Sequence, residues 1–244
     1  MQKIISYPIS FIASLLFLLT LLIFHPIQWV CFTVFGYQAH KKSVDYLNLV
    51  LLKIGYVLFN NFKIEGRENI PTGVPIIFVA NHQGMYDIIG MIWYLRKFHP
   101  KFVSKVELGK GIPSVSYNLR HGGSVLIDRK DPKQAIPAIK GLSEYIEKHK
   151  RSAVIFPEGT RSKTGKPKEF AHTGLKLLCK YAPSAYLVPI TINNSWKFFR
   201  YGAFPYGLGN DITFTIHEAL KVENYTFEDL MSKTENTIIQ GIEL

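Results

Sequence analysis

The segment Pro75–Asp87, with the sequence PIIFVANHQGMYD, decides the fold class of this 244-residue chain. It begins with a short apolar run rich in β-branched residues, which predicts a buried strand, and continues into a pattern typical of a helix. Five further runs of the same kind follow, and helical patterns separate several of them. Strands that alternate with helices predict an α/β fold with a largely parallel sheet flanked by helices. The expected strands are 75–80, 101–106, 124–127, 153–156, 186–192 and 212–216, and the expected helices are 87–97, 132–150 and 173–181.

The N-terminal part has a different composition, because no Asp, Glu, Lys or Arg occurs between Lys3 and Lys41. A stretch of this length and apolarity predicts a membrane-associated helical segment. Pro26 leaves two alternatives, one kinked span or a helical hairpin that dips into a single leaflet. Residues 44–60 carry apolar side chains at helical spacing, which predicts an amphipathic helix that packs on the main domain or lies on lipid.

We therefore expect two parts, a membrane-anchoring part over residues 1–60 and an α/β domain over residues 61–244. The basic pair Lys41 and Lys42 follows the apolar run. Positive flanks stay on the cytoplasmic side of a membrane. The α/β domain is thus expected to face the cytoplasm from the inner or cytoplasmic membrane.

The overall charge is strongly positive, with 29 Lys and Arg against 18 Asp and Glu, a formal net charge of +11. Such an excess attracts phosphate-bearing substrates, acidic lipid headgroups or nucleic acid. The apolar anchor and the lack of a nucleic-acid motif disfavour nucleic acid as a partner. The two cysteines, Cys31 and Cys179, and the scattered histidines show no ligand spacing, so we expect no metal site and no disulfide.

His82 and Asp87 are the first residues that carry chemistry. Five positions apart on one regular helix, they would lie roughly 140° apart around the axis and would not meet. They can meet if His82 lies in the strand-to-helix turn and Asp87 in the first helical turn. Asp87 would then fix one imidazole nitrogen and leave the other as a base. On these residues alone the alternative stays open that Asp87 caps the helix and His82 is a turn residue.

Three further segments lie in or directly after expected strands. Gly123–Arg129 ends in the charged pair Asp128 and Arg129, where α/β folds place ligand contacts. In Phe156–Ser162, Glu158 offers a carboxylate and Gly159 allows a close approach of the backbone. Thr160 offers a hydroxyl, and Arg161 offers a guanidinium that can bind phosphate. An exposed turn without a ligand is the alternative for that segment. Pro189 predicts an edge strand or a strand that lines a site.

Taken in order, these four segments resemble the motifs of the 1-acyl-sn-glycerol-3-phosphate acyltransferases, the lysophosphatidic acid acyltransferases of phospholipid synthesis. The pattern is Asn-His-x4-Asp, Gly-x-x-x-Ile-Asp-Arg, Phe-Pro-Glu-Gly-Thr-Arg-Ser and Val-Pro-Ile, and all four occur between residues 81 and 190. The resemblance implies a glycerolipid-acyltransferase-like fold. It also implies transfer of an acyl chain from an acyl thioester to the sn-2 hydroxyl of lysophosphatidic acid, which gives phosphatidic acid.

The resemblance also implies roles for individual residues. His82 is the general base and Asp87 its orienting partner. The acceptor's phosphate is contacted by Arg161 and Arg129, with Lys105, from the stretch Lys105–Leu108, as a further contact. The acceptor pocket is shaped by Glu158, Gly159 and Thr160. No cofactor is implied, since acyl-CoA or acyl carrier protein is a co-substrate, and membrane lipid is the expected partner.

Two departures from the family pattern keep alternatives open. Gly84 stands where members often have Ser, so a capping hydroxyl is missing there, and the stretch Phe170–Gly174 is less basic than is common. The alternatives are acyl transfer to another lysolipid such as a lyso-aminolipid, a lipid hydrolase, or a non-catalytic, membrane-anchored lipid-binding protein.

Residues 194–211 are expected to form a long surface loop that touches lipid or substrate.

Overall fold

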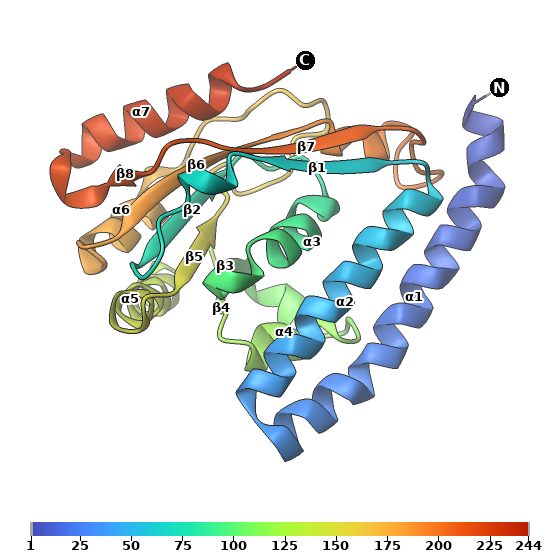
Figure 1. Cartoon of the computed structure of the whole chain (residues 1–244), viewed down its shortest axis with the longest axis horizontal. Helices are drawn as coiled ribbons and strands as arrows, with labels where there is room; N and C mark the ends of the chain where they lie inside the picture. The colour runs from blue at the N-terminus through green and yellow to red at the C-terminus, as the bar shows by residue number, and fades with distance from the viewer. Residues whose placement is uncertain (1, 244) are drawn as a thin grey trace.

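The computed structural model describes residues 2–243, which form an eight-stranded sheet with helices on both faces and a pair of long N-terminal helices at one side (Figure 1). The strand order is β1-β7-β6-β2-β5-β3-β4, with β8 beside β6. All neighbouring strands are parallel except the pairs of β6 with β7 and with β8. The largely parallel, helix-flanked sheet is therefore confirmed. The strands are β1 (Asn61–Glu65), β2 (Ile76–Ala80), β3 (Pro100–Lys105), β4 (Val125–Ile127), β5 (Ser152–Ile155), β6 (Tyr186–Asn193), β7 (Asp211–Ile216) and β8 (Leu220–Lys221).

The central strand β2 explains why the sheet is covered on both sides. Its five residues are all buried, and alternate residues of a strand point to opposite faces. Ile76 and Phe78 belong to one apolar cluster, and Ile77 and Val79 belong to the other. The first cluster includes α2 (Tyr37–Val57) and α3 (Met85–Tyr94), and the second includes α5 (Pro132–His149), α6 (His172–Tyr181) and α7 (Phe227–Gln240).

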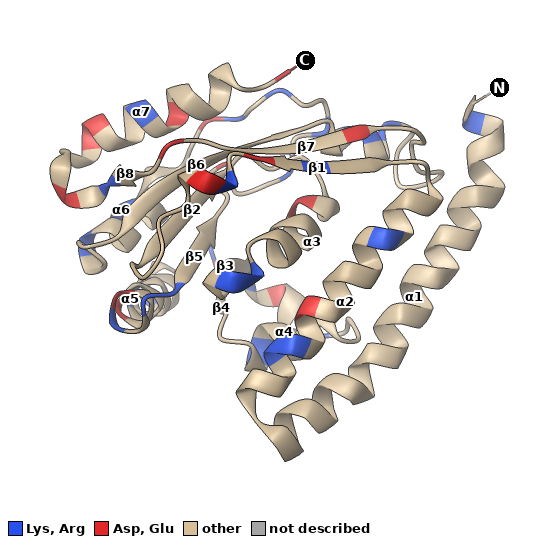
Figure 2. Ribbon diagram, viewed as in Figure 1, with Lys and Arg blue, Asp and Glu red and all other residues tan. Residues whose placement is uncertain are grey.

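Helix α1 (Gln2–Phe35) runs without interruption through Pro8 and Pro26 and turns into α2 at Gly36, where φ is 78°. The two helices lie side by side as a hairpin, so the chain reverses at Gly36 and not at Pro26 (Figure 1). Figure 2 shows that α1 carries no charged residue beyond its first turn. Its most apolar 18-residue window is only 17% buried, and by length and composition α1 could cross a membrane. An apolar N-terminal helix of this kind is compatible with membrane association.

The hairpin is fixed to the rest of the molecule through polar contacts. The hydroxyl of Ser114, just before α4 (Val115–His121), donates to the carbonyl of Leu21 at 2.6 Å. The loop 194–210, which connects β6 to β7, also contacts α1. The backbone N–H of Tyr206 donates to Ser10 Oγ at 2.8 Å, and Ser14 Oγ donates to the Tyr206 hydroxyl at 3.1 Å. The loop therefore lies between α1 and the sheet.

Pro189 lies in a central strand, so the edge-strand expectation is wrong. Strand β6 pairs with β2 on one side and with β7 and β8 on the other. The pairing with β7 ends at its last residue, Ile216, which lies opposite Ile190. The pairing with β8 begins at its first residue, Leu220, which lies opposite Leu187. Pro189 lies between these pairs, where the partner strand is interrupted. Its missing N–H therefore costs no ladder hydrogen bond.

Candidate active site

The turns that follow β2 and β5 form the centre of the site. These strands are parallel neighbours, so their carboxyl ends meet at one edge of the sheet, where α/β folds bind ligands. A hydrogen bond of 2.7 Å from the Ser162 N–H to the His82 carbonyl joins the two turns. Lys105 ends β3 and Arg129 follows β4 at the same edge. The fold thus brings the turns after β2 and β5 together with Lys105 and Arg129 at one edge of the sheet.

His82 and Asp87 are in direct contact, with 2.8 Å between Nδ1 and Oδ2. Asp87 is the third residue of α3 and is fully buried. Its Oδ2 also accepts the backbone N–H groups of Gln83 at 2.6 Å and Gly84 at 2.7 Å. An aspartate oxygen that already accepts two backbone N–H groups acts as an acceptor toward the imidazole as well. We therefore assign the proton to Nδ1 of His82, which leaves Nε2 as an acceptor.

The ring of His82 is held on its other sides as well. It stacks on Phe156, with 4.1 Å between ring centroids and 20° between planes. The His82 backbone N–H donates to Glu158 Oε1 at 2.7 Å. Because both the backbone and the ring have fixed partners, the imidazole has little freedom to turn away from Asp87.

Glu158, which is expected to shape the acceptor pocket, lies beside the His82 turn. It does not line the cavity described below, and its second oxygen accepts the Lys168 N–H at 3.0 Å. Burial raises the pKa of the Glu158 carboxyl, and the N–H groups of His82 and Lys168 act in the opposite direction. The side chain joins the His82 turn to the loop 159–168, which is a structural task.

A cavity of about 700 Å³ opens beside His82. Its apolar lining includes Ile88, Phe102, Phe156 and Phe199, and its lining contains no acidic side chain. Five cationic residues line it, namely Lys105, Arg129, Arg161, Lys163 and Lys168. An apolar cavity with a cationic lining suits a molecule with an acyl chain and an anionic group.

Of the predicted site residues, the cavity brings together His82, Lys105, Arg129, Gly159, Thr160 and Arg161. Asp87 lies behind His82, as an orienting residue would. The Arg129 guanidinium donates to the Gly159 carbonyl and so joins the segment after β4 to the turn after β5. Lys168 Nζ donates to Thr160 Oγ1 at 2.7 Å, which orders the exposed end of the same turn.

Among the lining residues that were not predicted as site residues, four add charge or aromatic surface to the cavity. Lys163 and Lys168 belong to a basic run that continues from Arg161, and this run was a usable signal. Trp196 and Phe199 come from the loop 194–210, which was expected to touch lipid or substrate. Their place in the cavity depends on how that loop folds back, and the sequence carries no pattern for it.

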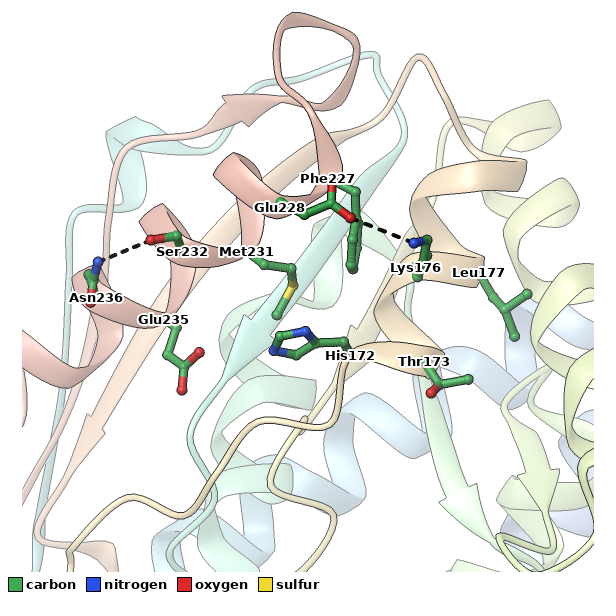
Figure 3. Close-up of a pocket in the computed structure, with 10 residues that line it drawn as sticks. All are labelled: His172, Thr173, Lys176, Leu177, Phe227, Glu228, Met231, Ser232, Glu235 and Asn236. Atoms are coloured by element: carbon green, nitrogen blue, oxygen red, sulfur yellow. Dashed lines mark hydrogen bonds and ion pairs between the residues drawn. The ribbon is translucent and has the colours of Figure 1, made fainter.

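A second cavity, of about 490 Å³, lies between α6 and α7 on the other face of the sheet (Figure 3). It also contains a histidine, His172, with Glu228 and Glu235 nearby. Glu228 instead pairs with Lys176 at 3.7 Å, where both side chains are mostly exposed. Over residues 2–243, no three His, Cys, Asp or Glu side chains gather as a metal site, in this cavity or elsewhere.

Fold and site together define a class of α/β enzyme in which a His–Asp pair at the carboxyl edge of a parallel sheet lies beside an apolar, cation-lined cavity. The family model described as Acyltransferase matches residues 61–193, which is more than half of the chain. The chain belongs to this acyltransferase family. The resemblance drawn from the four sequence segments is therefore confirmed.

Relatives of known name support the same family. The chain is 37% identical over 140 residues to the 1-acyl-sn-glycerol-3-phosphate acyltransferase of Helicobacter pylori, covering 56% of each chain. It is 30% identical over 164 residues to the chloroplastic LPAT1 enzyme of that name from Arabidopsis thaliana, covering 67% of this chain and 44% of the relative. The chain thus spans about half the length of the curated relatives it matches.

The crystal structure of the 1-acyl-sn-glycerophosphate (LPA) acyltransferase PlsC from Thermotoga maritima has a similar fold. The TM-score is 0.78 at 23% identity, and the match covers 99% of this chain and 96% of the other. At this identity the likeness concerns the fold. It includes the N-terminal helices, because almost the whole chain is covered.

Proposed function

We propose that this protein transfers an acyl chain from an acyl thioester to the sn-2 hydroxyl of lysophosphatidic acid, which forms phosphatidic acid for phospholipid biosynthesis. The observation that carries the proposal is the His82–Asp87 pair, 2.8 Å apart, beside a cavity lined by apolar and cationic residues. The named relatives act on the same acceptor according to their names.

In this mechanism His82 is the general base. Its Nε2 takes the proton of the acceptor hydroxyl while the hydroxyl oxygen attacks the thioester carbonyl carbon. The resulting tetrahedral intermediate breaks its C–S bond, and the thiolate leaves with the proton that His82 returns. Base catalysis of this kind contributes roughly 10²–10⁴ in rate, and holding both substrates together contributes much of the rest. Asp87 stabilises the imidazolium that forms and keeps the tautomer in which Nε2 is free.

The acceptor's phosphate would be bound by Arg161, Arg129 and Lys105, whose side chains supply several N–H donors and positive charge. Gly159 and Thr160 shape the turn that carries Arg161. The acyl chains would lie against the apolar lining of the cavity. The thioester donor is acyl-CoA or acyl carrier protein, and both are included in the test below.

We further propose that residues 1–60 anchor the protein to the cytoplasmic membrane and that the domain 61–244 faces the cytoplasm. The exposed apolar side chains of α1 support the anchor, because a soluble surface would not leave so large an apolar patch uncovered. Both substrates are amphiphiles, so an enzyme held at the lipid surface meets its acceptor without extracting it into water.

The test is acyl transfer by purified protein in liposomes, with a labelled acyl chain supplied in parallel as the CoA and the carrier-protein thioester. Lysophosphatidic acid and a lyso-aminolipid serve as separate acceptors, and His82→Ala is the control. We expect labelled phosphatidic acid that disappears in the variant. Product from the lyso-aminolipid alone would refute the phosphate-bearing acceptor, and acyl release without any acceptor would indicate a hydrolase.

A further inference from the structure

Phe156 follows β5 directly, and its place in the sheet brings its ring against His82. The last pair between β2 and β5 joins Val79 to Ile155, so Phe156 comes level with the start of the turn that carries His82. The two rings stack, with 4.1 Å between centroids and 20° between planes. One face of the imidazole is therefore covered by the face of a benzene ring.

The ring of Phe156 is itself held by Phe102 of β3. In the pairing of β3 with β5, Phe102 lies opposite Val154, and Phe156 comes two residues further along the chain. Residues two apart on a strand point to the same face of a sheet. The rings of Phe102 and Phe156 also stack, with 6.4 Å between centroids and 26° between planes. Phe156 thus has two aromatic neighbours that limit its rotation.

The spacing between His82 and Phe156 suits a charged imidazolium better than a neutral imidazole. Pairs of neutral aromatic rings usually keep about 4.5–7 Å between centroids, because their negative faces repel each other when they overlap fully. A cation within about 6 Å of a ring centroid is instead attracted by the ring face. At 4.1 Å the two rings overlap closely, so the attraction is largest when both nitrogens of His82 carry a proton.

The charges around His82 act in both directions on an imidazolium. Asp87 of α3 accepts from Nδ1 at 2.8 Å and stabilises it. Glu158 is joined to the His82 backbone N–H and accepts the Lys168 N–H with its other oxygen. The cations that line the cavity oppose a further positive charge there, and they are Lys105, Arg129, Arg161, Lys163 and Lys168. A ring face that favours positive charge therefore adds to the effect of Asp87.

We propose that Phe156 is a positioning residue that acts through His82: its ring face stabilises the imidazolium that forms when Nε2 takes the proton of the acceptor hydroxyl. The stack holds the plane of the imidazole before the reaction, and the attraction grows as positive charge develops on the ring. Because this interaction is stronger in the transition state than before it, it raises kcat. The role rests on the proposed acyl transfer, in which His82 is the base.

The test is Phe156→Leu, which keeps an apolar side chain and removes the ring face. We expect kcat to fall about five-fold while the acceptor KM stays within about three-fold. Without the ring face, the imidazolium loses its proton at lower pH. The midpoint of the His82 ring titration, followed by NMR without substrate, is therefore expected to move down by about half a pH unit. The acid limb of the kcat profile is expected to move in the same direction.

Two further variants separate the ring face from packing. Phe156→Tyr retains the ring face and is expected to keep the wild-type titration midpoint. Phe62→Leu is the matched control, because Phe62 is buried and stacks on Tyr86, with 5.4 Å between centroids and 24° between planes. Phe62 lies on β1, outside the cavity beside His82. The control is expected to leave the midpoint unchanged and kcat within about two-fold.

Three results would overturn the proposal. If Phe156 only packs against His82, Phe156→Leu lowers kcat and leaves the titration midpoint where it is. If the ring acts by keeping water from the imidazole, the smaller Leu admits water and the midpoint rises. The third is a midpoint in Phe156→Tyr as low as that in Phe156→Leu.

The titration also separates this proposal from the proposed function. If the unmodified chain transfers no acyl group, the proposed function fails. The midpoint of the His82 titration in Phe156→Leu still decides whether the ring of Phe156 stabilises the imidazolium, because that measurement needs no substrate.

Discussion

The cavity beside His82 and the groove between α6 and α7 both contain a histidine with a carboxylate nearby, yet they differ in how those groups are held. Asp87 is fully buried, accepts three N–H donors and lies at a helix N-terminus. In the groove between α6 and α7, the Glu228 side chain is 77% exposed and pairs with Lys176 across 3.7 Å. Exposed pairs of that kind contribute little energy and fix little geometry. The comparison teaches that fixed donors, and not the residue types alone, make a histidine a usable base.

The largest expected effect comes from His82→Ala. Removal of the base is expected to lower kcat by about 10³-fold, because the acceptor hydroxyl keeps its proton during attack. Steady-state acyl transfer checks this, with His172→Ala in the groove between α6 and α7 as the matched variant, expected to stay within about two-fold. Comparable losses of kcat in both variants would mean that the way His82 is held does not distinguish it from His172.

Asp87→Asn is expected to lower kcat about 10²-fold. An amide cannot accept three N–H donors, and its own N–H group favours the tautomer in which Nε2 of His82 carries the proton. The same kinetic assay measures the loss, together with ring ¹⁵N chemical shifts. Glu235→Gln in the groove is the control, and an equal effect there would contradict the orienting role.

Arg161→Ala is expected to raise the KM for lysophosphatidic acid about ten-fold with a smaller change in kcat, because a charge-assisted contact to phosphate is lost. Measurements of KM for phosphate-bearing and phosphate-free acceptors separate the two effects. Lys176→Ala removes one cation from the other cavity without touching the site. An equal rise in KM for both kinds of acceptor would mean that Arg161 does not bind the phosphate.

The smallest effect concerns Glu158. Burial raises its carboxyl pKa above the ordinary 4.5, so the folded chain holds this proton more tightly than the unfolded chain. The carboxyl therefore favours folding as pH falls through its folded pKa toward 4.5, and opposes folding above that pKa. Glu158→Gln has no such titration. The difference in unfolding free energy, wild type minus variant, should fall as pH rises through the folded pKa of Glu158.

Urea unfolding between pH 4 and 7 measures that difference. Glu228→Gln is the control, since Glu228 is mostly exposed in the second cavity. An equally steep pH dependence in the control would mean that burial of Glu158 is not its cause.

The sequence predicts the elements that carry strong patterns. The six expected strands and three expected helices are all present, with boundaries within about two or three residues in most cases. Strand β1 was missed because only Phe62 and Ile64 of its five residues are apolar, and β8 was missed because it has only two residues. Helix α7 was missed although Thr226 caps it, accepting the Asp229 N–H at 3.1 Å, and although Leu230, Met231, Thr234 and Ile238 recur at helical spacing.

The site was predictable where its chemistry is local. His82 lies in the turn before α3 and Asp87 lies in the first turn of α3, so the two residues are close to each other in sequence. The position of Glu158 was not predictable, because its partner His82 lies 76 residues away and the contact depends on two parallel strands ending together.

The contacts of Ser10 and Ser14 with Tyr206 matter for anyone who wants this protein in a soluble form. Deletion of α1 would remove the apolar surface that requires detergent. It would also leave the loop 194–210 without its support, and the cavity wall formed by Trp196 and Phe199 belongs to that loop. Polar substitutions at exposed positions such as Leu18 and Leu22, 50% and 48% exposed, keep both serines in place. Solubility engineering should therefore redesign the outer surface of α1 and retain the helix.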